Sequence, residues 1–390
     1  MPTDGAGTPA GDWLWADALP GDGVLLRPFR ESDADDVTAG CADPLTRRFL
    51  PALPDPYTRA DALWWITEAA PAAFTKGGAA FAVADPATGR LLGTVGISRH
   101  RPEDTGSAEI GYWVGPWARG RGVATAAART LAAHAVRRGV VRLELRTAWE
   151  NVASQRVALG AGFAREGVAR DAGRFPDGSR YDQIVWVRLA ADPGTPTPRL
   201  LPDLPGAHAP PRRALTDGVV SLRPLGPDDA EDTYTLRREP DVYARSVPPV
   251  PPSADEVARV CARAQARWLA GDTAAFTVRD AATDAYAGEI ALYFQEPVTG
   301  QAMIGYSIAA DARGRGYATR AARLVAAWAF DVAGIDRLIA GTAPDNVGSQ
   351  RVLEHAGFRR EGFQRARLPG APGAPRVDDI LYALLPDDLA

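Results

Sequence analysis

Residues 118–125 read Ala-Arg-Gly-Arg-Gly-Val-Ala-Thr, and residues 312–319 read Ala-Arg-Gly-Arg-Gly-Tyr-Ala-Thr. Each octapeptide follows an Ile-Gly-Tyr triplet, at 110–112 and at 304–306, and leads into an alanine-rich stretch with apolar residues at helical spacing. The pattern predicts, in two copies, a strand, a short loop and a helix that begins among residues with small side chains.

This strand–loop–helix unit has the properties of an anion site. The first backbone N–H groups of a helix have no partner within the helix, and the helix dipole adds partial positive charge there. Glycine and alanine let a phosphate come close to those groups. Two known phosphate motifs do not fit, because the dinucleotide fingerprint needs a third glycine where Thr125 stands, and a P-loop needs a Gly-Lys-Ser/Thr sequence that does not occur. The motif that remains is Arg-x-x-Gly-x-Ala, from Arg119 to Ala124 and from Arg313 to Ala318.

The repeat extends over nearly the whole chain. Residues 24–28 (Val-Leu-Leu-Arg-Pro) match residues 220–224 (Val-Ser-Leu-Arg-Pro), and the Asn-x-x-Ser-Gln-Arg-Val stretch that starts at Asn151 matches the one that starts at Asn346. Equivalent residues lie about 195 positions apart, so the chain contains two homologous domains and not a series of short structural repeats.

These observations predict the domain organisation. We expect a disordered tail over residues 1–12, a first domain over 13–192, a proline-rich linker over 193–213 and a second domain over 214–390. Each domain, at roughly 180 residues, is long enough to bury a full hydrophobic core.

The patterning within each half predicts an α/β (α+β) fold. In the first half we expect strands over residues 24–29, 80–85, 91–99, 107–114 and 141–147, followed by two final strands after residue 160. We expect helices over residues 32–40, 59–75, 121–138 and 152–160. Because hairpins are combined with one helical crossover, the sheet should be mixed and mostly antiparallel, with helices on its faces.

The order of the motifs, which is Leu-Arg-Pro, Ile-Gly-Tyr, Arg-Gly-x-Gly-x-Ala-Thr, Asn-x-x-Ser-x-Arg-Val and Gly-Phe, resembles the GNAT N-acyltransferases, and within them the ribosomal-protein N-terminal acetyltransferase (Rim-like) branch. The resemblance implies two tandem GNAT domains, each with a splayed wedge in its sheet that receives acyl-CoA. It implies acetyl-CoA or another acyl-CoA as the cofactor, and no metal. The residues that it assigns to the cofactor are Arg119, Gly120, Arg121, Gly122, Val123, Ala124, Thr125 and Asn151 in the first half, and Arg313, Gly314, Arg315, Gly316, Tyr317, Ala318, Thr319, Asn346 and Ser349 in the second.

The expected reaction sets requirements for the catalytic residues. An amine that attacks a thioester must be neutral, and the departing thiolate needs a proton. An α-amino group, with a pKa near 7.7–8.0, is more often neutral at pH 7 than a lysine, with a pKa near 10.4, so the α-amine is the easier acceptor.

The resemblance supplies candidates for these roles. Glu109 precedes Ile-Gly-Tyr on the strand beside the wedge, where the Rim-like branch often has an acidic residue that faces the acceptor, and it is the candidate general base; otherwise it is an ordinary strand glutamate. Ser154 is the candidate proton donor, or a helix-capping residue. Asn151, matched by Asn346, holds either the pantetheine arm or the strand-end loop through its amide, and Asp182 either lines the acceptor site or caps a turn.

The halves differ at the position of the candidate base. Met303 stands where the first half has Glu109, and a methionine cannot accept a proton. Glu289, on the preceding strand, is a possible substitute. We therefore expect the N-terminal half to carry most of the turnover, and the alternative is two active sites with different acceptors. The adjacent tryptophans Trp64 and Trp65 cannot both face the core, so one of them lines the acceptor groove or a domain contact.

Composition excludes several other classes of protein. The formal net charge of -4 argues against a nucleic-acid partner, because such proteins are usually strongly basic. No run approaches the roughly 18 apolar residues of a membrane span, and the N-terminus lacks the layout of a signal peptide, so we expect no membrane partner and a cytoplasmic location. Cys41 and Cys261 occupy non-equivalent positions without metal-ligand spacing, which supports neither a disulfide framework nor a zinc site. A covalent acyl-Cys41 intermediate would need a neighbouring base that the sequence does not show.

Three functions remain open at this point. The first is an acyl-CoA-dependent N-acyltransferase that acts on the N-terminal α-amine of a peptide or protein by direct attack in a ternary complex. The second is acylation of a small amine, such as an aminoglycoside or a polyamine. The third is a non-catalytic acyl-CoA sensor or scaffold. The sequence leaves the acyl chain length and the oligomeric state unspecified.

Overall fold

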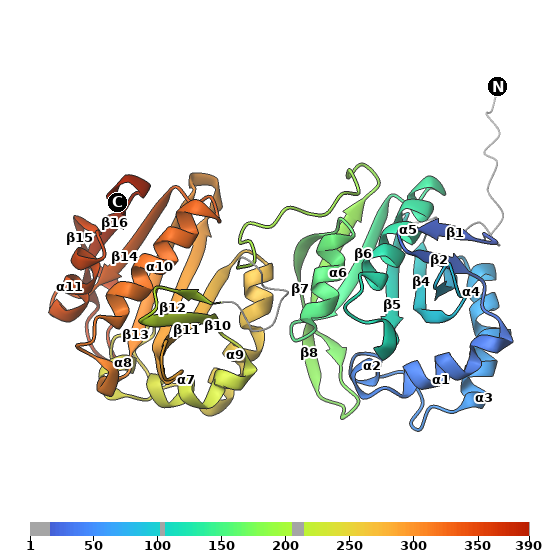
Figure 1. Ribbon diagram of the computed structural model, residues 1–390, viewed down its shortest axis with the longest axis horizontal. Helices are drawn as coiled ribbons and strands as arrows, with labels where there is room; N and C mark the ends of the chain where they lie inside the picture. Colours follow the sequence, from blue (N-terminus) through green and yellow to red (C-terminus); the bar gives the residue numbers. More distant parts are fainter. Residues whose placement is uncertain (1–15, 102–105, 205–213, 390) are drawn as a thin grey trace. The chain divides into compact units, whose positions relative to one another are not determined.

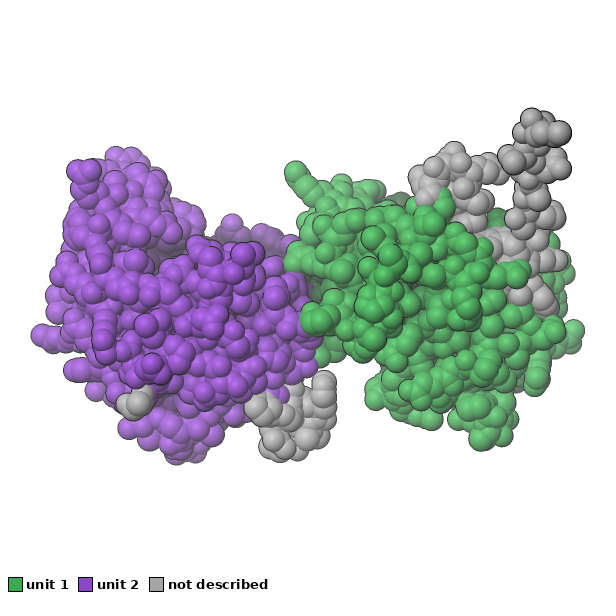
Figure 2. All heavy atoms as spheres, turned by 90° about the horizontal axis from the view of Figure 1, so that it is seen from above, with its two compact units in different colours: residues 1–198 green, residues 199–390 purple. Residues whose placement is uncertain are grey.

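The computed structural model describes residues 16–101, 106–204 and 214–389. It divides into two compact units, unit 1 (residues 1–198) and unit 2 (residues 199–390), which are coloured separately in Figure 2. The tail expected over residues 1–12 and the end of the expected linker lie outside the described residues.

Within its described residues, unit 1 is built on one eight-stranded sheet with the strand order β1-β2-β3-β4-β5-β6-β8-β7 (Figure 1). Neighbouring strands are antiparallel except β5 and β6, which run parallel. The strands are β1 (Leu19–Gly21), β2 (Val24–Arg27), β3 (Ala79–Ala84), β4 (Leu91–Arg101), β5 (Ser107–Val114), β6 (Arg142–Ala148), β7 (Ala164–Arg174) and β8 (Arg180–Leu189). The helices are α1 (Ala34–Ala42), α2 (Pro44–Phe49), α3 (Arg59–Trp64), α4 (Ala70–Thr75), α5 (Val123–Arg137) and α6 (Val152–Gly160).

Unit 2 repeats this architecture in its described residues, with an eight-stranded sheet in the order β9-β10-β11-β12-β13-β14-β16-β15 and one parallel pair, β13 with β14. The strands are β9 (Leu215–Thr216), β10 (Val220–Pro224), β11 (Thr273–Asp280), β12 (Tyr286–Glu296), β13 (Gln301–Ile308), β14 (Arg337–Thr342), β15 (Arg359–Leu368) and β16 (Val377–Leu384). The helices are α7 (Ala230–Arg237), α8 (Pro240–Tyr243), α9 (Ala254–Leu269), α10 (Tyr317–Asp331) and α11 (Val347–His355).

Alternation along the strands gives each sheet two apolar faces. In unit 2, Phe276 and Ile304 pack into one cluster with Val325 of α10, whereas Ala275, the neighbour of Phe276, packs with Cys261 of α9 on the other face. The helix after the glycine-rich loop therefore covers one face, and the helices from the start of the domain cover the other. These layers agree with the expected α/β class and mixed sheet.

The central parallel pair opens into a wedge in both units. Strands β5 and β6 pair only over Ser107–Glu109 with Arg142–Glu144, and β13 and β14 pair only over Gln301–Met303 with Arg337–Ile339. All four strands continue beyond the last pair without pairing to each other. The splayed wedge that the family resemblance implies is therefore present twice.

The helix expected over residues 59–75 is interrupted. It consists of α3, a π-helical turn over Trp65–Ala69, and α4. Pro71 in the first turn of α4 has no N–H to donate, which breaks the regular hydrogen-bond ladder at this point. The short elements α2 and β1 were not expected from the sequence.

The proline-rich segment packs onto the two units in its described part. The Thr197 N–H donates to the Leu159 carbonyl (2.9 Å) and the Thr197 hydroxyl to the Phe163 carbonyl (2.8 Å), both in unit 1. On the far side of the boundary, Leu201 and Leu204 are buried in the core of unit 2. Apolar side chains thus anchor a segment that we expected to be an extended connector.

Candidate active site

The glycine-rich loop of unit 1 has the backbone conformation that an anion site requires. Gly120 and Gly122 have φ angles of 72° and 77°, in the left-handed region that strains residues with a Cβ. Gly122 precedes α5, and no side chain caps that helix. A Cβ on either glycine would meet no atom within 4 Å, so the loop is open at both glycines, next to the helix end whose first N–H groups have no partner within the helix.

The loop of unit 2 has the same geometry. Gly314 and Gly316 both have φ of 76°, Gly316 precedes α10 without a side-chain cap, and a Cβ on either would meet nothing within 4 Å. Each loop follows the carboxyl end of the strand that carries Ile-Gly-Tyr, and this is the end at which the parallel pair has parted. Both bare helix ends therefore lie at the open end of a wedge.

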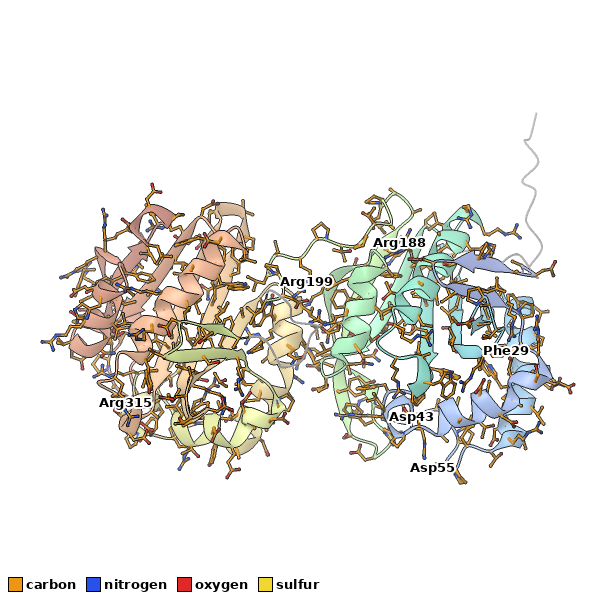
Figure 3. The ribbon with its side chains drawn as sticks, in the orientation of Figure 1. Phe29, Asp43, Asp55, Arg188, Arg199 and Arg315 are labelled. Carbon is orange, nitrogen blue, oxygen red and sulfur yellow. The ribbon has the colours of Figure 1, made fainter. Side chains whose placement is uncertain are left out.

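The side chains of Arg119 and Arg313 are directed away from these sites. The Arg119 guanidinium donates to the carboxylate of Asp43, the N-cap residue of α2 (labelled in Figure 3), to the Thr46 hydroxyl (2.9 Å) and to the Val114 carbonyl (3.2 Å). These bonds lower the pKa of the Asp43 carboxyl, whose partial burial acts in the opposite direction. Arg313 is likewise bonded to acidic side chains at the start of α8. The two arginines, assigned to the cofactor from sequence, thus connect the loop to a helix of the same unit.

Arg119→Ala is therefore expected to act mainly on stability. Loss of this partly buried pair should lower the free energy of unfolding by about 1 kcal/mol, because Asp43 loses its charged partner. Affinity for coenzyme A should change by less than about threefold. Urea unfolding and calorimetric titration measure the two quantities, and a large loss of affinity at unchanged stability would return Arg119 to the cofactor site.

Two other residues of the motif are buried in the protein interior. Val123 and Tyr317 are 5% and 6% exposed. The Tyr317 hydroxyl donates to the Asp280 carboxylate (2.5 Å), and this bond is the main cause that lowers the pKa of Asp280 to about 2. Val123 and Tyr317 can therefore contribute only backbone N–H groups to a ligand.

The remaining loop residues fall into two groups. Arg121, Ala124, Ala318 and Thr319 are exposed or half-buried near the start of their helices. Arg315 donates to the Asp311 carbonyl (3.1 Å), and Thr125 lies against Gly160 of α6, where an added Cβ would come within 2.8 Å of the threonine methyl.

Asn151 and Asn346 cap the helices that follow β6 and β14. The side-chain oxygen of Asn151 accepts the Ser154 N–H (3.1 Å), and that of Asn346 accepts the Ser349 N–H (3.2 Å). The cap of each helix is therefore the asparagine, and the serine hydroxyl has another partner.

That partner is the tyrosine of the Ile-Gly-Tyr triplet. The Tyr112 and Ser154 hydroxyl oxygens are 2.7 Å apart, and those of Tyr306 and Ser349 are 2.8 Å apart. Burial raises the pKa of Tyr306 to about 12, and it also raises the pKa of Tyr112, so both phenols keep their protons at neutral pH. Each pair joins the strand on one side of the wedge to the helix that follows the other. Sequence reasoning used this triplet only as a repeat marker and missed the tyrosine.

Glu109 is half-buried on the same face of β5 as Gly111 and Trp113, and α1 and α3 pack on this face around Trp113. Its Oε2 is 3.9 Å from Nε of Arg146, and its side chain is 25% exposed. Glu109 is also the last residue of β5 that pairs with β6. The carboxylate thus lies at the point where the strands part, beside the Arg146 guanidinium.

Glu289 of unit 2 has a different situation. Its two carboxylate oxygens accept hydrogen bonds from Arg237 of α7, each 2.9 Å long. The negative charge of Glu289 raises the pKa of Arg237, against the effect of burial. Because Arg237 engages both oxygens, Glu289 is poorly placed to replace the base missing at Met303.

Other sequence candidates find structural roles. Burial raises the pKa of the Cys41 thiol to about 11, so it is not a nucleophile at neutral pH. The Asp182 carboxylate accepts the backbone N–H of Asp171 (2.9 Å), which is the turn-capping arrangement. Trp65 packs edge-on against Phe29, whereas Trp64 is 62% exposed and free to contact a ligand.

The described part of the chain offers no group of three His, Cys, Asp or Glu side chains arranged to hold a metal ion. Nor does any helix within the described ranges have the length and apolar character to cross a membrane.

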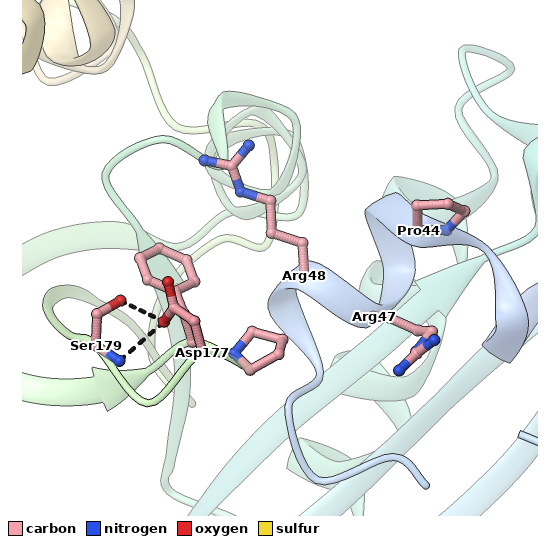
Figure 4. Close-up of a pocket in the computed structure, with 7 residues that line it drawn as sticks. Pro44, Arg47, Arg48, Asp177 and Ser179 are labelled. Carbon is pink, nitrogen blue, oxygen red and sulfur yellow. Dashed lines mark hydrogen bonds between the residues drawn. The ribbon is translucent and has the colours of Figure 1, made fainter. Parts of the chain in front are cut away.

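A hollow of about 640 Å³ opens between α2 and the turn that joins β7 to β8 (Figure 4). Its wall includes Arg48, whose guanidinium lies 5.8 Å from the centre of the Phe175 ring. Arg47 forms an ion pair with Asp55, and the Ser179 amide and hydroxyl bond to Asp177 (2.8 and 2.6 Å). The helix α2, which forms one wall of this hollow, is also bonded at its N-cap residue to Arg119 of the glycine-rich loop.

Comparison with known proteins gives consistent results. A family model described as "Acetyltransferase (GNAT) domain" matches residues 24–164 and 220–359, which together exceed half of the chain. The probable N-acetyltransferase YjcK of Bacillus subtilis (strain 168) is 31% identical over 183 residues, covering 45% of this chain and 98% of that protein. YnaD, an uncharacterized N-acetyltransferase of the same organism, is 33% identical over 85 residues, covering 22% of this chain and 49% of that protein.

Two solved structures illustrate the range of similar folds. Mycobacterium smegmatis RimJ in complex with CoA-disulfide is 24% identical with a TM-score of 0.40, covering 44% of this chain and 84% of that chain. Spermidine N-acetyltransferase from Vibrio cholerae, in complex with CoA and spermine, is 18% identical with a TM-score of 0.40, covering 44% of this chain and 99% of that chain.

Proposed function

The chain belongs to the GNAT family of acetyltransferases, and on that premise we propose that it transfers an acetyl group from acetyl-CoA to the N-terminal α-amine of a peptide or protein. The observation that carries the proposal is the pair of uncapped helices, α5 and α10, behind left-handed glycines at the open ends of the two wedges. Acetyl-CoA supplies a thioester whose carbonyl an amine can attack.

In unit 1, different residues bind the pyrophosphate and the pantetheine arm of acetyl-CoA. The N–H groups from Gly122 to Thr125 hold the pyrophosphate, since the helix dipole and the unpartnered donors favour an anion there. The side-chain nitrogen of Asn151 remains available for the pantetheine arm, because only its oxygen is used as the cap. The Arg119 side chain positions α2 beside the loop.

Glu109 and the Ser154–Tyr112 pair carry out the two proton transfers of the reaction. As the amine nitrogen bonds to the acyl carbon and the carbon–sulfur bond breaks, Glu109 takes the proton that the amine loses, directly or through one water. The Ser154 hydroxyl gives a proton to the departing thiolate and is resupplied by Tyr112 at 2.7 Å. The amine and the acyl carbon react directly, so no acyl-enzyme forms.

Two features support an N-terminal α-amine as the acceptor, namely its proton affinity and the hollow beside α2. An α-amine is partly neutral at pH 7, so only a weak base is needed to remove its proton during the reaction. The hollow between α2 and the β7–β8 turn is wide enough for a few residues of an extended peptide, and its aromatic and proline surface can pack against them.

The test compares matched acceptors. We expect a tetrapeptide with a free N-terminus and a blocked lysine to be acetylated at least about tenfold faster than the same peptide with a blocked N-terminus and a free lysine, and faster than spermidine or an aminoglycoside. Mass spectrometry of the products measures this. Acetylation of only the small amines would favour the second function, and coenzyme A binding without transfer would favour a sensor.

A further inference from the structure

Unit 2 contains a buried carboxylate to which the proposed function assigns no role. Asp379 lies in β16, where Ile380 and Tyr382 face the core beneath α10 and Asp379 faces the opposite side of the sheet. The residue is 5% exposed. Its Oδ1 is fully buried and has no hydrogen-bond partner among the described residues. A buried acceptor without a donor is unfavourable, so its presence calls for a ligand or a proton.

The carboxylate lies at the open part of the wedge. A Cβ on Gly341 of β14 would come within 2.4 Å of Oδ2 and 2.8 Å of Oδ1 of Asp379, so only glycine leaves room for this side chain. Pairing between β13 and β14 ends at Ile339. Gly341 is exposed two residues further on, where the strands have parted. The face that Asp379 shares with Gly341 also carries Met303, the position of the candidate base in unit 1.

Comparison of the two units shows a coordinated exchange. The strand registers align Arg146 with Gly341 and Gln183 with Asp379. In unit 1, Glu109 is on β5, and Glu144 and Arg146 occupy the same face of β6. In unit 2, Met303 on β13 stands in place of Glu109, and Gly341 on β14 stands in place of Arg146. The carboxylate of Asp379 lies on β16. Both wedges therefore have carboxylates on this face, and the one beside the parted strands without a bidentate arginine partner is Glu109 in unit 1 and Asp379 in unit 2, since Glu289 is engaged by Arg237.

The surroundings of Asp379 favour proton uptake. Burial raises the pKa of its carboxyl, against the weaker effects of Arg367 on β15 and of the backbone at Thr342 and Ile380. On the same face, Met303, Ile339 and Gly341 carry no charge, and the charged groups include Glu289 paired with Arg237 and Arg337 paired with Glu361. A cationic amine in the wedge would add a second positive charge beside this carboxylate, next to that of Arg367.

We propose that Asp379 receives the acceptor amine in unit 2, which makes unit 2 a second acetyltransferase site and not only a coenzyme A binding domain. Its carboxylate binds a primary ammonium group, which releases one proton to solvent and becomes the neutral nucleophile, and the carboxylate takes the second proton as the nitrogen–carbon bond forms. The carbon–sulfur bond breaks, and the thiolate takes a proton from the Ser349–Tyr306 pair. This inference rests on the proposed function, since unit 2 must hold acetyl-CoA.

The acceptor of unit 2 should differ from that of unit 1, because the helices at the two entrances differ. Where α2 has Leu45 and Arg47, α8 has Asp241 and Tyr243. Asp241 is paired with Arg313 of the loop. The two units thus present different charges to an approaching amine.

The test uses the full chain with Gly122→Val, so that binding and transfer come from unit 2 alone. Acetyl-CoA is offered with the tetrapeptides, spermidine and an aminoglycoside. Asp379→Asn should reduce thiol release at least about 100-fold on the acceptor that unit 2 uses, with one acetyl-CoA still bound per chain. Asp378→Asn is the matched control, since that carboxylate only accepts the Ala366 N–H (2.7 Å), and its rate should stay within about threefold.

The dependence of the free energy of unfolding on pH gives a second readout, which needs no acceptor. Because folding raises the pKa of Asp379, the folded parent binds its proton more tightly than the unfolded chain, and stability falls as pH rises from the unfolded value through the folded pKa. Asp379→Asn should lose this dependence and be at least as stable as the parent at pH 7. A structural aspartate would instead give a destabilised variant. Asp379→Gln, which installs the unit 1 residue, repeats the test if the Asn variant folds poorly.

The outcomes separate the inference from its premise. If the Gly122→Val protein binds no acetyl-CoA, the cofactor assignment of unit 2 is wrong. If it binds acetyl-CoA but acetylates none of the offered amines, or if Asp379→Asn keeps more than about a third of the rate, the role of Asp379 is overturned.

Discussion

Glu109→Gln is expected to lower the rate of acetyl transfer by unit 1 by roughly 10²–10⁴-fold, the range for loss of a general base. The variant is made with Gly316→Val so that unit 2 does not contribute. The affinity for acetyl-CoA should change by less than about threefold, because Glu109 lies on β5 at the point where the strands part and not at the glycine-rich loop. Thiol release at saturating acetyl-CoA and peptide measures the rate.

The matched control is Glu166→Gln. Glu166 pairs with Arg142 in the same group of charges, but it is on β7, away from the parting strands, so its loss should leave the rate within about threefold. The Glu109→Gln rate should recover with rising pH, because the amine then loses its proton to solvent. A reduction below about threefold, without that pH dependence, would make Glu109 a structural residue.

Gly122→Val is expected to remove coenzyme A binding from unit 1 and leave unit 2 intact, and Gly316→Val is expected to do the reverse. Valine is strained at φ of 77° or 76°, and its branches would fill the space in front of the first N–H groups of the helix. Calorimetric titration should find about one site per chain in each single variant and none in the double variant.

Gly139→Val provides the control for backbone strain. Gly139 has φ of 102° at the other end of α5, and a Cβ there would meet no atom within 4 Å. Valine at this position should lower stability to a similar extent and keep both sites. Two normal sites in either loop variant would show that the loops do not bind coenzyme A.

Local features of the site could be predicted from the sequence, and long-range ones could not. The glycines, the uncapped helix and the Asn-x-x-Ser turn are specified by neighbouring residues, and the structure has them at the expected positions. The partner of Arg119 is Asp43, 76 residues away, and no local pattern identifies such a pair.

The same limit applies to the two carboxylates of unit 2. Glu289 could be proposed as a base because it is near Met303 in the chain, but its engagement by Arg237, 52 residues earlier, depends on how α7 packs on the sheet. The sequence does not single out Asp379, because it is one of two adjacent aspartates near the start of a strand. Its significance depends on the absence of a side chain at Gly341, on a neighbouring strand.

The most direct test of acetyl transfer by the two wedges is the ratio of coenzyme A thiol released to amine acetylated by the unmodified chain. With acetyl-CoA and the free N-terminal tetrapeptide, we predict one acetylated α-amine for each coenzyme A thiol, and no thiol above background from the Gly122→Val, Gly316→Val double variant. Thiol release without acetylated product, or binding of acetyl-CoA with no release on any amine offered, would contradict the conclusion that the two wedges are acetyltransferase sites.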